Sequence, residues 1–505
     1  MPSARPKDDV AESPRAAKLA RGLSFALALL AALLLGATLV TALHDVSTAW
    51  DVWYYHLPFA ARIVRLVPEG AYVFHPLNQA RYEGFPLLGE LIQGLLWRTL
   101  GAPQASNLLA FAAVPCLAIF LRRRFQVPLH LTVVALFAVP LVQLHASSCY
   151  VDLPASAALT MLLFTVFEAW TLPEPVTPRR LAAMLALAAF AANMRLQLLV
   201  PVALALLAAS PRVLGAWPRP PRALGRAPSR LAWGRFLAGV AALPLVFATP
   251  LKNLILHHNP LFPMRLAVGP LALPGTEDVY HSSPPYLERA PQALRFAISL
   301  LEIGIRPITD PHRWSIDQWM PSDSTGNRMG GFFGAYVVFH VALLVLLARR
   351  REDRPKALAF AALTAVTAAL PQSHELRYYL YWMLTLIALN LVLACQRART
   401  EGSADAPGAV LGPPLIGAAG ALALTAVLAS TRMAYVYPSG DTLPELLASK
   451  VRAETVAQIR DGERVCLPGR EPWTFLYAAK LHPGRSYVVQ EAERPEDCGD
   501  HRPIE

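Results

Sequence analysis

The chain has 505 residues, 54% of them hydrophobic, and a formal net charge of +11. With a mean hydropathy of +0.37, this composition excludes an ordinary soluble protein and indicates that lipid surrounds most of the chain. The positive charge does not indicate nucleic acid as a partner, because the basic residues cluster in short gaps between long apolar runs.

Eleven apolar runs predict a mainly α-helical, polytopic membrane protein with about eleven transmembrane helices. Every second gap is predicted to be cytoplasmic, and these gaps hold half of the 46 Lys and Arg residues but less than a quarter of the 35 Asp and Glu residues. The positive-inside rule therefore predicts a cytoplasmic N-terminus and an external C-terminus. The predicted spans are Gly22–Leu43, Ser106–Leu121, Val127–His145, Val151–Trp170, Leu181–Asn193, Leu196–Ala209, Phe236–Leu251, Phe332–Ala348, Ala357–Leu370, Tyr378–Cys395 and Val410–Ser430. The predicted cytoplasmic segments are 1–21, 122–127, 173–180, 211–235, 349–356 and 396–408.

Three long segments are predicted on the outer side. The first, 44–105, holds two amphipathic stretches, Leu57–Val67 and Pro86–Leu100, which are too short and too polar to span and should lie in the membrane interface. The second, 252–331, is rich in proline and has one helical stretch near Ala293–Ile303.

The third outer segment, 431–505, is predicted to be a small α/β unit with candidate strands at Val465–Leu467 and Ser486–Gln490. It holds Cys466 and Cys498, and an oxidising compartment would allow these to form a disulfide, although the sequence does not show whether they meet. The predicted organisation is thus a basic cytoplasmic tail (1–21), a transmembrane domain (22–430) and a C-terminal non-cytoplasmic segment (431–505).

Two acidic residues follow apolar runs on the predicted outer side. Asp51 lies just past the first span among aromatic residues, where a carboxylate can act as a general base or hold a divalent metal. Asp152 lies at the start of a later span and is followed by Leu153 and Pro154. Each residue taken alone also fits a helix start, which is the commoner use of Asp in such a position. Their recurrence at successive outer ends predicts that both face one cavity.

Three basic residues are predicted near the same face: Arg195, Lys252 and Arg377. Arg suits a phosphate because its planar guanidinium can donate two parallel hydrogen bonds. For Lys252 we favour a side chain that simply reaches for the interface. Arg377, which lies between Glu375 and Tyr378, is the stronger candidate for binding an anion. The sequence has no Walker loop, dinucleotide fingerprint, HExxH or CxxC motif, so a nucleotide site is unsupported.

Five stretches of the sequence, in order, resemble the polytopic GT-C glycosyltransferases, the group that holds protein O-mannosyltransferases and the bacterial lipid A aminoarabinose transferase. Asp51 with Tyr55-His56-Leu57-Pro58 resembles the acidic motif of the first loop. Arg81-Tyr82-Glu83-Gly84-Phe85-Pro86 resembles the start of the second juxtamembrane helix, and Tyr150-Val151-Asp152 resembles the second acidic loop. Asn259-Pro260-Leu261-Phe262-Pro263 and Glu375-Leu376-Arg377-Tyr378 resemble later landmarks. The likeness covers roughly residues 20–400.

The resemblance implies an inverting transfer of a hexosyl or pentosyl group from a polyprenyl-phosphate donor to a glycan, lipid or protein acceptor. Asp51 would be the general base, Asp152 would assist through the acceptor or a divalent metal, and Arg377 would hold the lipid phosphate. Members close to the aminoarabinose transferase often carry Lys where this chain has Glu83-Gly84, so the phosphate clamp is unassigned. Tyr55, His56, Glu83, Arg195, Lys252, Asn259, Glu375 and Tyr378 are the further candidates for substrate binding.

The implied location is the inner or plasma membrane, among membrane lipids, with the site facing the periplasm or exterior and no nucleic acid as partner. The main alternative is a multi-pass transporter or flippase of lipid-linked or small substrates. A transporter places its ionisable groups near mid-bilayer, whereas those here collect at the outer helix ends. A structural subunit without activity is a third reading, which the two acidic residues make less attractive.

Overall fold

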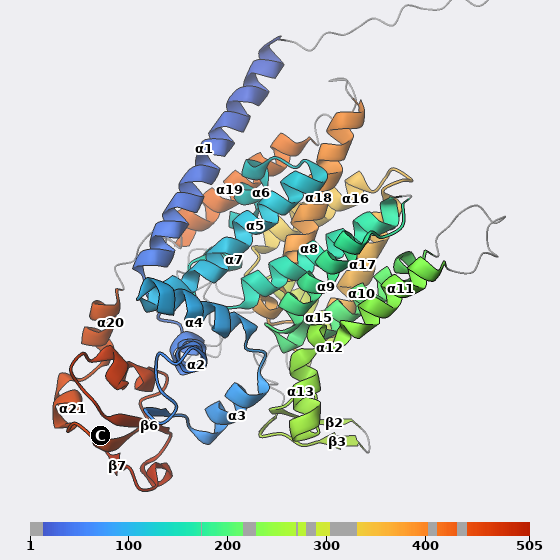
Figure 1. Ribbon diagram of the computed structural model, residues 1–505. Helices are drawn as coiled ribbons and strands as arrows, with labels where there is room; N and C mark the ends of the chain where they lie inside the picture. Colours follow the sequence, from blue (N-terminus) through green and yellow to red (C-terminus); the bar gives the residue numbers. More distant parts are fainter. Residues whose placement is uncertain are drawn as a thin grey trace, which may run out of the picture.

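The computed structural model of the chain describes residues 14–172, 174–215, 229–268, 271–278, 289–302, 331–401, 412–431 and 442–504. Most of these residues form a helical bundle, with smaller elements gathered at one end of it (Figure 1). Parts of three predicted segments fall outside the described residues: the basic tail, the proline- and arginine-rich segment 211–235, and the outer loop 252–331. The same holds for most of the predicted cytoplasmic segment 396–408, for the start of the last predicted span and for residues 432–441 of the C-terminal segment.

Every predicted span contains a helix. The bundle consists of α1 (Pro14–His44), α5 (Leu108–Phe125), α6 (Leu129–Phe137), α7 (Pro140–Ala146), α8 (Asp152–Thr171), α9 (Pro178–Ala192), α10 (Leu199–Val213), α11 (Arg230–Ala241), α12 (Leu243–Val246), α13 (Ala248–His257), α16 (Gly334–Leu347), α17 (Arg354–Ala369), α18 (Leu380–Glu401) and α19 (Pro413–Thr431). Among the described residues, five helices are long and apolar enough to cross a membrane, or up to seven if each of two bent pairs is one span. The chain is therefore a multi-pass membrane protein, and the predicted number of eleven crossings stays a prediction.

Two of the predicted spans are broken into bent helix pairs. In Val127–His145, the helices α6 and α7 meet at 100°, and in the region of Phe236–Leu251, α11 and α12 are bent by 60° from α13. Pro140 begins α7, and the preceding Val139 is extended, with φ −91° and ψ 116°. A proline disfavours helical backbone in the residue before it and has no N–H to donate. The prolines therefore account for the first break.

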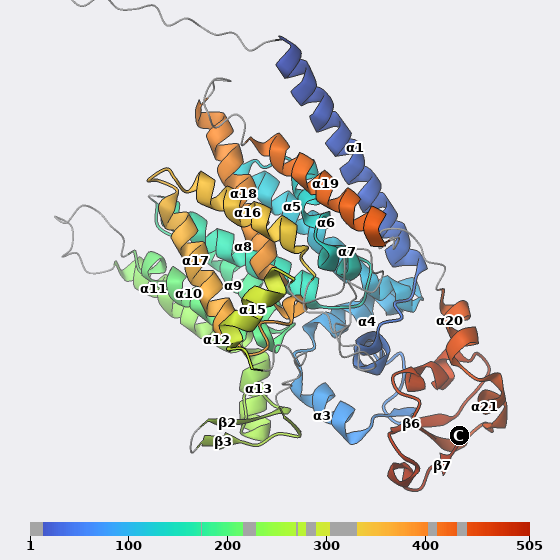
Figure 2. The same ribbon diagram turned by 180° about the vertical axis from the view of Figure 1, so that it is seen from behind.

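The basic helix ends gather at one end of the bundle. Arg124 at the end of α5 pairs with Glu168 at the end of α8, and Arg212 at the end of α10 donates to the carbonyl of Ala169 on α8 at 2.6 Å. Arg399 of α18 donates to the carbonyl of Phe125 at 3.0 Å. The N-terminal end of α1 lies on this side in both views, opposite the C-terminal elements (Figures 1 and 2). The side predicted to be cytoplasmic is thus a single end of the bundle.

The other end carries the short elements of the first predicted outer loop. They are η1 (Val52–His56), α2 (Leu57–Ile63), β1 (Tyr72–Val73), α3 (Pro76–Gly84), α4 (Leu88–Leu100) and η2 (Pro103–Asn107). Beside them lie β2 (Met264–Val268), β3 (Leu271–Leu273) and β4 (Glu277–Asp278), while α15 (Gln292–Leu300) and the short η5 (Leu376–Tyr379) pack nearer the bundle.

The helix α4 turns its polar face to the protein. Glu90 and Gln93 are buried, whereas Leu91 and Leu95 are 37% and 49% exposed. Such an inverted pattern is expected of a helix whose apolar side lies in lipid, and it supports the prediction of an interfacial helix. The first amphipathic stretch differs: α2 is buried from Leu57 to Ala61, because α4 and η1 pack against it.

The C-terminal elements form a small unit around a parallel sheet. It contains α20 (Leu443–Lys450), α21 (Ala453–Gln458), β5 (Arg464–Pro468), η7 (Trp473–Tyr477), η8 (Ala479–Leu481), β6 (Val488–Ala492), η9 (Pro495–Cys498) and β7 (Arg502–Pro503). The strand order is β1-β6-β5-β7, so a strand of the first outer loop completes the sheet, with Tyr72 opposite Val489. We call residues 442–504 the C-terminal unit.

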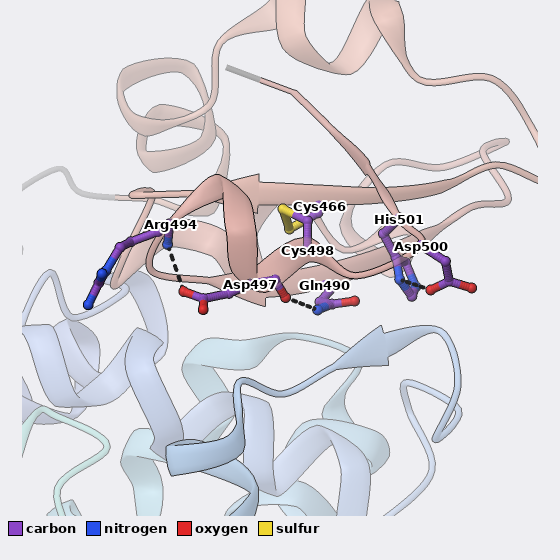
Figure 3. The surroundings of a disulfide bond; sticks show 7 residues. All are labelled: Cys466, Gln490, Arg494, Asp497, Cys498, Asp500 and His501. Atoms are coloured by element: carbon purple, nitrogen blue, oxygen red, sulfur yellow. Dashed lines mark hydrogen bonds and ion pairs between the residues drawn. A yellow bond between two sulfur atoms is a disulfide. The ribbon is translucent and has the colours of Figure 1, made fainter.

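A disulfide joins Cys466 of β5 to Cys498 of η9 (Figure 3). The turn around it is held by Arg494, whose backbone N–H donates to the Asp497 carboxylate at 3.1 Å, and by Gln490, which donates to the Asp497 carbonyl at 3.0 Å. The disulfide therefore ties the segment after β6 back to β5.

Candidate active site

Asp51 lies between α1 and η1 with its carboxylate turned into the protein. Residues Val52–His56 form one π-helical turn, and all five are buried; such turns occur often at functional sites. Asp51 occupies the N-cap position of this turn, but its side chain makes no capping hydrogen bond. Its Oδ2 instead accepts a hydrogen bond from Nη1 of Arg377 at 3.0 Å. The structure thus uses the carboxylate in an ion pair and leaves the capping role unfilled.

Asp152 forms a second acid–arginine pair. It is the first residue of α8 and is 1% exposed. Its Oδ2 lies 2.5 Å from Nη2 of Arg195 and 3.8 Å from Nε2 of His145, while its Oδ1 is buried without a hydrogen-bond partner. One oxygen of Asp152 therefore remains available at the helix end.

Aromatic rings join the two pairs into one cluster. The guanidinium carbons of Arg377 and Arg195 lie 4.8 Å and 5.2 Å from the centre of the Tyr378 ring, and Nη2 of Arg377 donates to the Tyr378 hydroxyl at 2.9 Å. Arg377 also lies 5.5 Å from the centre of the Tyr150 ring. The sequence placed these residues on four separate segments, and packing brings them to one end of the bundle.

The charges of the cluster determine the protonation of its carboxyl groups. Burial acts to raise the pKa of Asp51, but the neighbouring Arg377, with help from His56, Arg195 and the Tyr55 hydroxyl, holds it below its usual value. Burial raises the pKa of Glu375 to about 7 against the opposing effect of Arg377, and the charge on Asp51 adds to the rise. Below that pH the cluster has two guanidinium groups and two carboxylates, with Glu375 neutral. An ionised Asp51 fits a base, and the paired arginines fit an anion.

His56 and Glu90 form a buried pair beside this cluster. Nδ1 of His56 lies 2.7 Å from Oε1 of Glu90, and the His56 ring lies 4.4 Å from that of Tyr55. The sequence analysis assigned no site role to Glu90 or His145. The sequence does contain a signal for Glu90. It lies on the polar face of an amphipathic helix whose apolar face suits lipid, and the polar face of such a helix must pack against protein.

The other candidates lie outside the cluster and stabilise neighbouring turns. Lys252 donates to the backbone carbonyl of Glu83, and the Glu83 carboxylate accepts from Gln79 at 2.7 Å. Asn259 donates to the carbonyls of Met264 and Pro274 at 2.7 Å each, which closes the turn into β2. These contacts connect α13 and its hairpin to the end of α3.

The described residues do not offer an evident metal site. They contain no group of three or more His, Cys, Asp or Glu side chains placed to hold a metal ion. Asp51 and Asp152 are each paired with an arginine, and a guanidinium would repel a divalent cation at the same carboxylate. The donor set therefore does not fit the divalent metal that was considered for these two residues.

An apolar groove opens between α10 and α13. It has a volume of about 420 Å³ and is lined by residues that include Leu199, Val200, Phe247, Leu251, Leu254 and Leu261. Leu199 lies four positions after Arg195, and Lys252 lies within the same turn as Leu251. The groove is lined by apolar residues alone.

Solved structures with similar folds exist. The first is ArnT from Cupriavidus metallidurans in the apo state, with a TM-score of 0.52 and 12% identity over 95% of this chain and 87% of that chain. This chain has the GT-C fold. The same ArnT bound to undecaprenyl phosphate gives a TM-score of 0.53 and 13% identity over the same shares.

Arabinofuranosyltransferase AftD from Mycobacteria gives a TM-score of 0.41 and 18% identity over 92% of this chain and 31% of that chain. No family model and no curated protein matches the sequence. The likeness to ArnT, at 12% and 13% identity, shows the fold alone, and the activity must be argued from the cluster itself.

Proposed function

We propose that this GT-C chain is an integral membrane glycosyltransferase that moves a sugar from a polyprenyl-phosphate donor to an acceptor on the outer side of the membrane. The observation that carries the proposal is the Asp51–Arg377 pair beside the Asp152–Arg195 pair at one end of the bundle. The ArnT of similar fold was solved with undecaprenyl phosphate, which supports this class of donor.

The cluster has the groups that such a transfer needs. The bond between the sugar's anomeric carbon and the phosphate oxygen breaks, and the acceptor oxygen forms the new bond on the opposite face, with inversion. The phosphate leaves as an anion, so it requires cations and no strong acid. Asp51 takes the acceptor's proton, and base catalysis of this kind contributes on the order of 10²–10⁴ in rate.

The pairing of Asp51 with Arg377 has a consequence for donor binding. An arriving phosphate competes with Asp51 for Arg377, and the sugar must then lie between the phosphate and the carboxylate. Inverting displacement by water or an acceptor needs roughly 6.5–9.5 Å between the base and the group at the leaving oxygen. We therefore propose that donor binding separates Arg377 from Asp51, with Asp152 and Arg195 holding the acceptor or the phosphate.

The apolar groove fits the isoprenoid tail of the same donor. Its lining is aliphatic and aromatic, which suits a hydrocarbon chain. The tail would enter sideways from the bilayer while the phosphate faces the cluster.

The position of the cluster disfavours a transporter. Asp152 is the first residue of α8, Asp51 follows the end of α1, and Arg377 lies in η5, the short turn that directly precedes α18. Transporters bind their substrates near mid-bilayer, often at interrupted helices. Ion pairs at helix ends fit chemistry at the membrane surface better.

The test compares the surface glycans and lipids of cells with and without the chain by mass spectrometry. We expect a species that carries one added hexosyl or pentosyl group only when the wild-type chain is present, and we expect D51N to abolish it with membrane insertion unchanged. Wild-type amounts of the product from D51N would remove Asp51 from the mechanism.

A further inference from the structure

The C-terminal unit contacts the segment that carries Asp51 through one buried carboxylate. Glu491 of β6 is 2% exposed. Its Oε1 accepts from the Tyr72 hydroxyl at 2.6 Å, and its Oε2 accepts from the backbone N–H of His75 and from Nδ2 of Asn78, both at 3.0 Å. All three donors belong to the first outer loop, more than 400 residues earlier in the chain.

Asn78 continues this connection to the π-helical turn after Asp51. Its Nδ2 also donates to the backbone carbonyl of Tyr54 at 3.2 Å, and a side-chain amide has two N–H groups to share between two acceptors. Asn78 is fully buried. A chain of hydrogen bonds therefore runs from Glu491 through Asn78 to a residue three positions after Asp51.

Two ring contacts support the same turn from the same unit. The Trp53 ring lies 6.4 Å from that of Phe475 in η7, and the Tyr72 ring lies 5.0 Å from that of Phe475 in an edge-on arrangement. Glu491 also fixes His75, which is the N-cap residue of α3. From α3, Arg81 extends over the Tyr54 ring, with its guanidinium carbon 5.4 Å from the ring centre.

We propose that Glu491 is a positioning residue for Asp51, so that the C-terminal unit is a working part of the catalytic site. The inference rests on the proposed function in taking Asp51 as the base, but the hydrogen-bond chain it describes can be tested without any substrate. A misplacement of 1 Å at a reacting group can cost about 10²-fold in rate. Loss of the Glu491 carboxylate should therefore strongly reduce the rate of sugar transfer, through the position of Asp51 and not through a contact between Glu491 and the substrate.

The choice of variants follows from the donors around Glu491. In E491Q the amide oxygen can accept from His75 and Asn78, and the amide N–H can donate to the Tyr72 oxygen, because a hydroxyl both donates and accepts. In E491M the volume is retained, but all three donors lose their acceptor. In N78A every residue of the C-terminal unit is retained, but the hydrogen bonds from Asn78 to Glu491 and to Tyr54 are both lost. E493Q, on an exposed residue two positions after Glu491, is the matched control.

The first measurement is amide hydrogen exchange of the purified full-length chain in detergent, read on residues 52–57. We expect at least tenfold faster exchange in E491M and N78A, and exchange within twofold of wild type in E491Q and E493Q. The second is the amount of glycosylated product in cells, which should fall about 10²-fold in E491M and N78A and recover in E491Q.

Unchanged exchange of residues 52–57 in N78A would overturn the proposal, even if E491M fails to fold. Equal loss of product in E491Q and E491M would also overturn it, because a purely steric role would not distinguish them. If D51N makes normal product while E491M and N78A still loosen residues 52–57, the proposed function fails and the connection between the two parts stands.

Discussion

Replacing Asp51 with Asn should move two measured quantities in opposite directions. The change removes the proposed base, so transfer should fall about 10²–10⁴-fold. It also removes a negative charge that lies 3.0 Å from the Arg377 guanidinium and competes with the donor phosphate. Binding of undecaprenyl phosphate should therefore become tighter.

The size of the binding effect follows from Coulomb's law. A phosphate on Arg377 and the Asp51 carboxylate, about 8 Å apart, repel by about 2.1 kcal/mol at an effective dielectric constant of about 20. Solvent in the partly open site should reduce this to about 1.4 kcal/mol, which is about tenfold in Kd. We therefore expect D51N to bind undecaprenyl phosphate about ten times more tightly than the wild type.

The assay is ligand binding to the purified chain, together with product formation in cells. E69Q is the control, because Glu69 is an exposed acid in the same loop; neither quantity should change. Weaker binding of undecaprenyl phosphate by D51N would refute the idea that Asp51 and the phosphate compete for Arg377. Unchanged transfer would refute its role as base.

Three further predictions follow from the same structure. R377A should raise the Kd for undecaprenyl phosphate about 10- to 150-fold, which corresponds to the ~1.5–3 kcal/mol of a charge-assisted hydrogen bond, and should raise the acceptor KM much less. The control is R349A, which replaces an exposed arginine at the other end of the bundle. An unchanged Kd in R377A would count against the phosphate role. Glu375 has a pKa of about 7, so it is neutral below that pH and adds a negative charge above it. Affinity for the donor should therefore fall as the pH rises through 7 in the wild type, and this fall should be missing in E375Q. Identical pH profiles of donor affinity in the two proteins would contradict a role for Glu375. C466S with C498S opens a loop of 32 residues and should lower the stability of the C-terminal unit by about 3–4 kcal/mol. The measurement is amide hydrogen exchange of residues 464–468 in increasing denaturant. Equal stability with and without the disulfide would show that the sheet alone holds the unit.

Hydropathy and charge predicted the helices because both are local sums over the sequence. A run such as Ser106–Leu121 is apolar enough to span whatever it packs against, and the three arginines that follow it, Arg122 to Arg124, mark its side. The breaks in the helices at Pro140 and near Phe247 were harder to predict from the sequence. Proline permits a kink without fixing its angle, which depends on the neighbouring helices.

The burial of polar residues could not be read in the same way. Glu90 lies on the polar face of α4, and in a soluble protein that face would meet water. Here the apolar residues Leu91 and Leu95 are exposed and Glu90 is buried against His56. Whether lipid or protein covers a face is a property of the assembled bundle.

The sequence by itself determined that this is a multi-pass helical membrane protein with acidic and basic residues collected at one set of helix ends, because composition and spacing along the chain decide both. Only the tertiary structure decided which of them meet: Asp51 with Arg377 across 326 positions, Asp152 with Arg195 across 43, and Glu491 with the loop that holds Asp51. Ion pairs between distant segments depend on how whole helices pack, and no local pattern of residues encodes that partner choice.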